Sequence, residues 1–367
     1  MSEVWQVQLK SLAGALTNIV DAYDSFTYTK RVNSTGGWAL RYAKHANETQ
    51  TAFETRCGLW VLDAQVEFWQ TNDTPVIAWR KDFEGLVRWQ RWYVRVDGAL
   101  VFEVGGRGYN DLLARRIVYA AAGSTHAAWS SAAETAMKDV ADYQCGPSAA
   151  VARQTTGLTI EADAAGGNTI TLKRAYRNVL EVLQEMAVLG DGDFAVVGTG
   201  AATYEFRYYN GQLGTDRSAT VIFALERGNM ASPSLSISRQ DEVNVAYVGG
   251  QGEGAERAIV ERSDAGLIAD STWNRCERFV HATNETTTAG LNSAGDRALD
   301  EGKPKYELSF NTLQTPGCMY GLHYFLGDLV TARFLNYSAT KKIAGVSITL
   351  NESGMSETSK TVETEDA

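Results

Sequence analysis

Strict alternation of apolar and polar residues near the C-terminus is the feature that most limits what this chain can fold into. From residue 306 to 310, and again from 346 to 350, every second residue is apolar. Successive side chains of a strand point to opposite faces of a sheet, so this period of two indicates half-buried strands. We place a polar hairpin at residues 338–342 and a positive-φ turn at Gly327-Asp328. The stretch 306–350 therefore predicts an antiparallel meander at the edge of a barrel or sandwich.

The first 104 residues repeat this pattern in shorter segments. The strand-like segments are 5–9, 26–32, 38–42, 59–69, 75–80 and 89–96. Clusters of Gly, Asn and Asp separate them, and Asp97-Gly98 is typical of a two-residue hairpin. Short strands joined in this way predict an all-β barrel or sandwich.

Seven of the nine tryptophans fall in this first region: Trp5, Trp38, Trp60, Trp69, Trp79, Trp89 and Trp92. Indole side chains are favoured in protein interfaces and on sugar-binding platforms, and they also pack into cores. We expect most of these residues in the core. Seven are more than one small barrel comfortably hides, so we expect some of them to meet another subunit.

The glycine-rich stretch 104–108 marks a change of period from two to 3.6. A helix is expected from Tyr109 to Ala120, with Asp111 and Arg115 as an ion pair one turn apart. The remaining expected helices begin at a Ser131/Glu134 capping box, cover 176–190, and cover 291–301. Strands are expected at 194–197, 203–209 and 221–223, which makes the middle of the chain an α+β unit.

Glycine-rich stretches do not indicate nucleotide binding here. Gly108 is followed by Tyr109-Asn110 and not by the Lys-Ser/Thr of a phosphate-binding loop. Residues 249–254 follow a strand, but residues 255–260 indicate a returning strand and not the crossover helix of a dinucleotide-binding unit. We therefore interpret 249–254 as a hairpin loop.

Charge and cysteine content narrow the class of protein. The net charge is −10, from 34 basic and 44 acidic side chains, and no block of Lys and Arg is present. Tight binding to nucleic acid through phosphate neutralisation is therefore disfavoured. The N-terminus indicates a strand, and no apolar run is long enough to cross a membrane. The separated cysteines Cys57, Cys145, Cys276 and Cys318 are expected to be free thiols.

No combination of residues predicts an active site. The histidines His45, His126, His281 and His323 are isolated, and Asp191 and Asp193 lack the further ligands of a calcium loop. Ser338 and Lys341 match a Ser-x-x-Lys pattern, but in a predicted hairpin. The pairs Asp82/Glu84 and Asp241/Glu242 could serve as glycosidase carboxylates only if their separation were right, which the sequence does not give. We predict no catalytic residue, no cofactor and no metal ligand, and hence no enzyme.

Three stretches of the chain resemble the tail-hub proteins of tailed bacteriophages and the N-terminal part of tail-associated lysins. They are 106–117, where a glycine turn opens a helix with paired leucines and arginines, the series 214–217, 221–223, 228–230 and 244–250, and 324–330. The similarity runs along roughly residues 100–350. The first 100 residues fit by their all-β character alone, and the segment 255–289 is not aligned with the family.

The resemblance implies a mainly β, α+β chain of two barrel-like antiparallel domains with a small α+β domain inserted between them. The expected domains are 1–105, a first β-barrel-like domain, 106–228, an α+β domain, 229–350, a second β-barrel-like domain, and 351–367, a disordered polar tail. Composition supports a disordered C-terminal segment, because 351–367 is rich in Ser, Thr and Glu.

The resemblance also implies a structural virion protein at the tail tip or baseplate, made in the host cytoplasm. Three copies would form a ring that ends the tail tube and lets DNA pass without specific binding. Its expected partners are tail-tube and distal tail proteins and tail fibre or spike proteins, with no membrane contact. A tail-associated cell-wall hydrolase subunit and a carbohydrate-binding host-recognition module remain alternatives.

Overall fold

The computed structural model describes most of the chain: residues 3–20, 23–73, 76–120, 123–283, 285, 287–350 and 358–366. It divides into two compact units. The larger unit contains Met1–Ala231 and Asn311–Ala367, and the smaller one contains Ser232–Phe310. The fold is mainly β and of the α+β class, as the sequence predicted.

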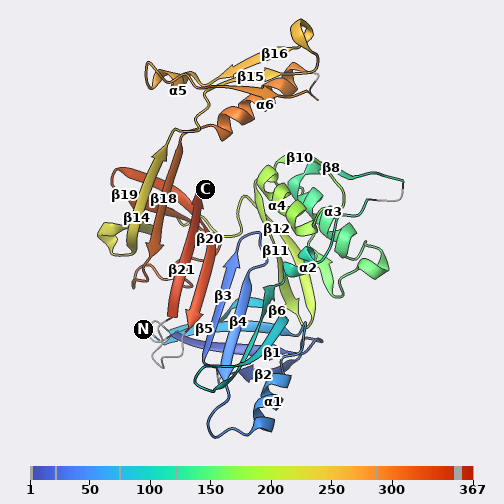
Figure 1. Ribbon diagram of the computed structural model, residues 1–367, viewed down its shortest axis with the longest axis vertical. Helices are drawn as coiled ribbons and strands as arrows, with labels where there is room; N and C mark the ends of the chain where they lie inside the picture. Colours follow the sequence, from blue (N-terminus) through green and yellow to red (C-terminus); the bar gives the residue numbers. More distant parts are fainter. Residues whose placement is uncertain are drawn as a thin grey trace. The chain divides into compact units, whose positions relative to one another are not determined.

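An 11-stranded sheet forms the centre of the larger unit (Figure 1). Its strands run in the order β13-β19-β20-β3-β4-β7-β6-β5-β1-β2, and β21 pairs with β20. The strands from the start of the chain are β1 (Glu3–Lys10), β2 (Leu16–Val20), β3 (Ser25–Arg31), β4 (Gly37–Ala43), β5 (Gln65–Asp73), β6 (Val76–Val94) and β7 (Leu100–Gly108). Those from later parts are β13 (Ile222–Ala224), β19 (Leu329–Phe334), β20 (Tyr337–Leu350) and β21 (Thr358–Asp366).

Strand β20 joins the beginning of the chain to its end. Its first residues pair with β19, and its last residues pair with both β3 and β21. The regions that the sequence assigned to separate barrel-like domains therefore share one sheet. The expected boundaries at 228 and 350 also differ from the compact units, since residues 232–310 form a unit of their own.

The core of this sheet follows from the period of two. On β3 and β4 every second side chain is buried, among them Phe26, Tyr28, Trp38 and Leu40. The rings of Phe26 and Tyr28 are stacked, and Trp38 meets Phe68 edge-on, which adds to the free energy gained by burying them. The Asp97-Gly98 hairpin between β6 and β7 is confirmed, with Gly98 at φ 83°.

The helix α1 (Gln50–Gly58) was not predicted from the sequence. Its first turn is capped by Thr49, whose hydroxyl accepts a hydrogen bond from the Ala52 amide at 3.2 Å. Only Phe53 and Cys57 are buried, so the helix has almost no apolar stripe for the sequence pattern to reveal.

The α+β part contains three helices, α2 (Asp111–Ala114), α3 (Ala133–Cys145) and α4 (Val179–Gly190), with 3₁₀ turns at Val151–Arg153 and, before β14, Leu225–Arg227. Its strands are β8 (Ala127–Ala132), β9 (Leu158–Ile160), β10 (Thr169–Arg174), β11 (Gly192–Gly200) and β12 (Thr203–Asn210). They form the sheets β11-β12-β9 and β10-β8. A buried cluster that includes Met137, Leu183 and Phe206 joins α3 and α4 to the sheet.

Two predictions about these helices are wrong. The helix expected from 109 to 120 ends at Ala114, because Ile117 instead forms a β-bridge with Asn178. The expected capping box is absent, because Ala132 is the N-cap and the Glu134 carboxylate binds Lys138 and a loop instead. The Asp111–Arg115 ion pair is confirmed, at 2.8 Å.

Two predictions near the C-terminus also fail. The turn between β19 and β20 lies at Leu335, which adopts φ 54°, so the expected hairpin at 338–342 is part of β20. Residues 358–366, expected to be disordered, form β21 because β20 offers them a free edge and Val362 is buried opposite Val346. Residues 351–357 of the expected tail lie outside the described residues.

The smaller unit contains a three-stranded sheet with one helix packed on it (Figure 1). The sheet has the order β16-β15-β17, from β15 (Val245–Gly249), β16 (Ile259–Ser263) and β17 (Glu277–His281). The helix α6 (Thr288–Glu301) packs on β15 and β16, and α5 (Ala265–Ala269) and a 3₁₀ turn at Gly254–Glu256 lie in loops. The interpretation of 249–254 as a hairpin loop is confirmed, because β15 and β16 are antiparallel. A separate pair of strands consists of β14 (Met230–Ser238) and β18 (Lys305–Thr312).

Candidate assembly site

The residues that the sequence offered for catalysis do not converge. Among the described residues no group of three or more His, Cys, Asp or Glu could hold a metal ion. All four cysteines are free thiols, as predicted. His323 accepts a hydrogen bond from the Met319 amide at 3.0 Å, and Ser338 and Lys341 lie within β20. No helix in the described part of the chain is long and apolar enough to cross a membrane.

Asp82 is the first of three buried carboxylates that join distant segments. Its Oδ1 pairs with Lys30 and with Arg80, each at 2.8 Å, and accepts a hydrogen bond from the Tyr320 hydroxyl at 3.0 Å. The Tyr28 hydroxyl donates to the other carboxylate oxygen. Burial alone would raise the pKa of Asp82, but the two cations and these hydrogen bonds hold it well below its usual range. Asp82 is therefore an ionised structural centre that ties β3 and β6 to the segment before β19.

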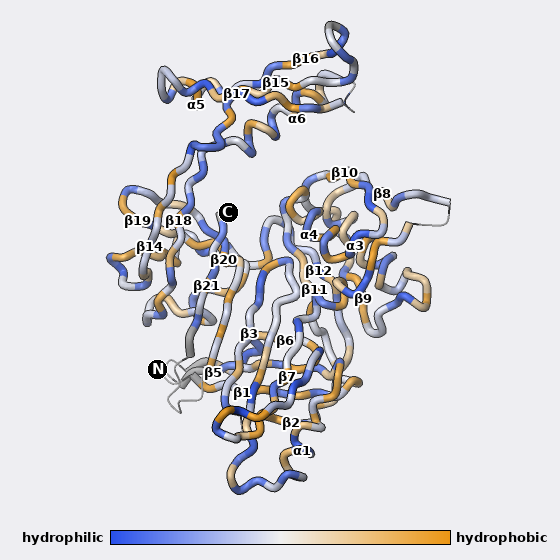
Figure 2. The backbone as a smooth tube through the Cα atoms, viewed as in Figure 1, coloured by the Kyte–Doolittle hydropathy of each residue, from blue (hydrophilic) through white to orange (hydrophobic). Residues whose placement is uncertain are grey.

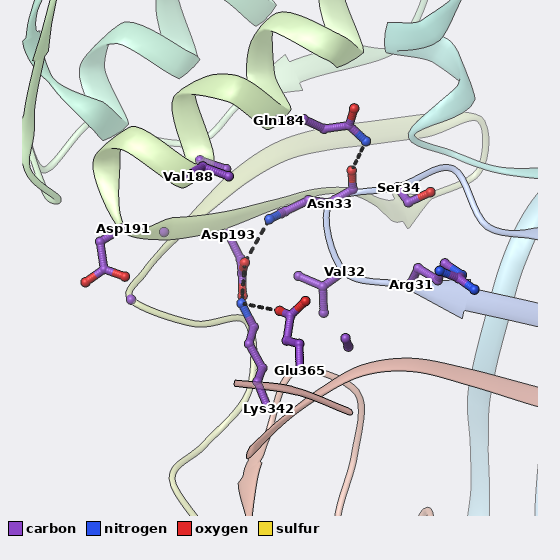
Figure 3. Close-up of a pocket in the computed structure, with 14 residues that line it drawn as sticks. Arg31, Val32, Asn33, Ser34, Gln184, Val188, Asp191, Asp193, Lys342 and Glu365 are labelled. Carbon is purple, nitrogen blue, oxygen red and sulfur yellow. Dashed lines mark hydrogen bonds and ion pairs between the residues drawn. The ribbon is translucent and has the colours of Figure 1, made fainter. Parts of the chain in front are cut away.

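Asp193, at the start of β11, is the second of these carboxylates and lines a cavity of about 530 Å³ (Figure 3). Its oxygens accept hydrogen bonds from the Asn33 side chain at 2.9 Å and the Leu213 amide at 2.7 Å, and pair with Lys342 at 2.7 Å. Figure 3 shows Gln184 of α4 reaching the same place, where its amide donates to the Asn33 carbonyl at 2.8 Å. The cavity thus lies where the β3–β4 turn, α4 with β11, and β20 meet.

Polar groups that line the cavity form ion pairs and hydrogen bonds with one another. Lys342, the cation nearest Asp193, also lies 3.8 Å from Glu365 of β21. Asn33 adopts φ 55°, a left-handed conformation that lets its side chain both donate to Asp193 and accept from the Phe194 amide at 2.8 Å. The cluster therefore connects segments that are distant in the sequence.

Asp328 is the third carboxylate and holds the turn before β19. It accepts hydrogen bonds from the amides of Thr215 and Phe325 and pairs with Arg217 at 2.7 Å. The left-handed Gly327 that precedes it confirms the predicted turn, since its φ is 85°. The sequence showed both segments, Gly214-Thr215-Asp216-Arg217 and Gly327-Asp328. It did not show that the two segments contact each other.

The tryptophans of the first region differ in exposure, and the prediction that some of them meet another subunit stays a prediction. Trp5, Trp38 and Trp60 are buried and Trp69 is half-buried, whereas Trp79, Trp89 and Trp92 are exposed. The indole of Trp92 packs against Phe102, with ring centroids 4.9 Å apart. Exposed apolar residues also follow α1 in the sequence. The side chain of Gln90, on β6, donates a hydrogen bond to the Trp60 carbonyl in this segment.

Exposed apolar residues of the larger unit fall into two groups. The apolar patch is made of Leu59, Val61, Leu62, Trp92 and Val94. The apolar edge is made of Leu12, Leu16 and Ile19, at and beside β2. Strand β2 pairs with β1 alone among the described strands, so its other backbone edge is available (Figures 1 and 2). Exposed apolar groups on an open edge are typical of a contact with another chain.

Comparison with known families identifies the chain. Residues 4–362 match the model of a family described as Siphovirus ReqiPepy6 Gp37-like protein. The chain belongs to this family. A comparison with curated protein sequences gave no match.

Solved structures with a similar fold include three tail proteins, two of them from prophages. The 43 kDa tail protein of prophage MuSo2 from Shewanella oneidensis has a TM-score of 0.60 at 11% identity, covering 100% of this chain and 98% of that one. A tail protein from Neisseria meningitidis MC58 has a TM-score of 0.55 at 13% identity, covering 99% and 96%. The prophage tail protein gp18 from Listeria monocytogenes EGD-e has a TM-score of 0.53 at 9% identity, covering 97% and 94%. This Gp37-like chain therefore shares the fold of these three tail proteins along almost its whole length.

Proposed function

We propose that the protein is the hub at the distal end of the phage tail, where three copies form a ring. The ring ends the tail tube, contacts tail-tube and distal tail proteins, and carries tail fibre or spike proteins. Membership of a siphovirus family and the fold of prophage tail proteins support this proposal. The buried carboxylates support it too, because they hold segments together and none is part of a catalytic arrangement.

The observation that carries the proposal is the apolar edge. Leu16 is 53% exposed and Ile19 is 44% exposed on a strand whose outer backbone groups have no partner strand among those described. Such an edge invites non-specific pairing unless it is covered. A neighbouring copy that covers it would satisfy the backbone groups and remove apolar surface from water, at roughly 25 cal/mol per Å².

The apolar patch gives each copy a second contact surface. Leu62 lies on the α1–β5 connection, and Trp92 lies on β6, which β5 and β1 separate from β2 in the sheet; both side chains are more than half exposed. Two different surfaces that meet in a head-to-tail contact generate a closed ring when the rotations from copy to copy add up to one full turn. Three copies would close such a ring.

DNA would pass through the hole of this ring without specific binding. The net charge of −10 supports this part of the proposal, because a negative wall repels phosphates. Replacing acids on the wall by Lys would then slow ejection of the genome. Ejection kinetics that stay the same after such replacements would contradict an electrostatic role of the wall.

The ring is tested by placing a charge on the apolar edge. We expect the purified chain to have a mass three times the 40.0 kDa of one copy, and Ile19→Lys to have the mass of one copy, because a buried lysine opposes the contact. Val151→Lys is the matched control, since Val151 is 85% exposed and lies far from β2 in the sequence. Mass photometry of all three proteins checks this. An Ile19→Lys protein that keeps the wild-type mass would contradict the use of β2 as a contact.

A further inference from the structure

A cavity of about 570 Å³ in the α+β part plays no role in the hub proposal. Residues of α3 and β8, which pack against each other, form much of its wall (Figure 1). The lining includes the side chains of Tyr119, Trp129, Asp139, Tyr143, Gln144 and Arg153. No residue of the apolar edge or of the apolar patch belongs to it. Its volume is in the range of small-molecule sites, roughly 300–1,000 Å³.

Three aromatic rings line this cavity, and they come from separate segments. Trp129 is on β8, Tyr143 is on α3, and Tyr119 follows the bridge at Ile117. Tyr119 is 55% and Tyr143 is 61% exposed, and Trp129 is half-buried. Among the described residues, the rings of Trp129 and Tyr143 form no pair with another ring and carry no cation. Because the faces of aromatic rings are electron-rich, such a lining suits a positively charged group.

One of the three rings already holds a cation of the protein itself. The Arg153 guanidinium lies 5.6 Å from the centre of the Tyr119 ring. Its Nη2 donates hydrogen bonds to the Ile117 carbonyl at 2.6 Å and to the side-chain oxygen of Gln144 at 3.1 Å. These acceptors hold Arg153 beside Tyr119, and in the described part of the chain it forms no ion pair with an acid.

Asp139 is a carboxylate of the cavity that lacks a partner. It lies one helical turn before Tyr143 on α3, so the two side chains share a face of the helix. Asp139 is exposed, and it forms no hydrogen bond or ion pair with any residue that the structure describes. Its pKa is raised by partial removal from water and by Asp163 and Asp142, which are both acids. A cation beside Asp139 would offset this repulsion.

We propose that this cavity binds a quaternary ammonium group, with its charge beside Asp139 and its methyl groups against the rings of Tyr143 and Trp129. A quaternary ammonium has no N–H to donate, so proteins recognise it by aromatic faces and by opposite charge. A primary amine would need hydrogen-bond acceptors, and the side-chain oxygen of Gln144 is already used by Arg153. The cavity volume leaves room for the molecule that carries the group.

The test uses the full chain and two compounds of the same shape, choline and the uncharged 3,3-dimethyl-1-butanol. By calorimetry we expect choline to bind with a Kd of about 1 mM or below, and the uncharged alcohol to bind at least about tenfold more weakly. Asp139→Asn and Tyr143→Leu should each weaken choline binding at least about fivefold. Tyr143→Phe keeps the ring and should bind choline as the wild type does.

Two matched controls change the same kinds of side chain elsewhere. Glu226→Gln removes an exposed acid, and Trp273→Leu removes a ring that is 91% exposed in the smaller unit. Each should leave the Kd for choline unchanged within about twofold. Circular dichroism checks that every variant is folded, which we expect because Asp139 and Tyr143 are both exposed.

Other outcomes would overturn the proposal. If neither compound binds, or both bind equally, the cavity does not recognise a quaternary ammonium. If a control variant weakens binding as much as Asp139→Asn, the site lies elsewhere. Sedimentation with phosphatidylcholine vesicles distinguishes the sources of the group: pelleting would assign it to a lipid head group, and choline binding without pelleting to a soluble molecule, and both agree with the proposal. The Ile19→Lys experiment tests the ring independently.

Discussion

Replacing Asp82 by Asn tests whether the buried carboxylates hold the larger unit together. The side chain of Asp82 is 1% exposed, and the change removes its charge while keeping its shape. Lys30 and Arg80 then lose their shared counter-ion inside the protein. Removing one partner of a buried ion pair costs about 3–5 kcal/mol, because the remaining charge stays buried without compensation. We therefore expect Asp82→Asn to lower the Tm by roughly 5–10 °C at neutral pH.

The same variant has a defined pH dependence. The pKa of Asp82 is lowered in the folded protein, so its contribution to stability is present above the unfolded-state pKa and is lost as the pH falls. The difference in Tm between wild type and Asp82→Asn should therefore shrink below about pH 4. Thermal unfolding followed by circular dichroism from neutral to acidic pH measures this. Glu226→Gln, at an exposed acid, is the control and should follow the wild type. A variant that melts with the wild type at neutral pH, or a difference that does not depend on pH, would refute the reasoning.

Two further changes test other parts of the fold. Glu134→Gln should lower the free energy of unfolding by about 3 kcal/mol, because Glu134 pairs with buried Lys138 at 2.6 Å and accepts from the Gly166 amide at 2.7 Å. Urea unfolding measures this free energy. An unchanged midpoint would show that Glu134 does not stabilise the loop at Gly166. Val362→Ala should cost about 2 kcal/mol, because the side chain is buried opposite Val346. Hydrogen exchange of β20 checks it, and unchanged protection would contradict a stabilising role for β21.

The sequence predicted those elements that depend on one local pattern over a few residues. Alternation predicted β18 and the end of β20, and Asp97-Gly98 predicted the turn between β6 and β7. The apolar stripe of α4 was correct from Val179 to Met186, although Tyr176 is exposed and lies before the helix. These elements are determined by local burial and turn chemistry, which the sequence displays directly.

What the sequence did not reveal depends on contacts between distant segments. Glu134 looked like a capping residue, and only the fold brings the loop at Gly166 to its carboxylate. Residues 358–366 looked disordered by composition, and only the edge of β20 makes them a strand. The sequence offered Asp82 as a candidate glycosidase carboxylate and placed Asp193 in an incomplete calcium loop. The lysines that pair with them come from other strands, which the sequence does not show. Exposure of Trp89 and Trp92 was expected for some tryptophans but could not be assigned to particular ones.

The most direct test of the account is electron microscopy of the purified full chain with two-dimensional averaging. The account predicts a ring of three copies with an open hole along its axis, in which the outer edge of β2 contacts the neighbouring copy. Single copies, or a twofold dimer without a hole, would contradict it.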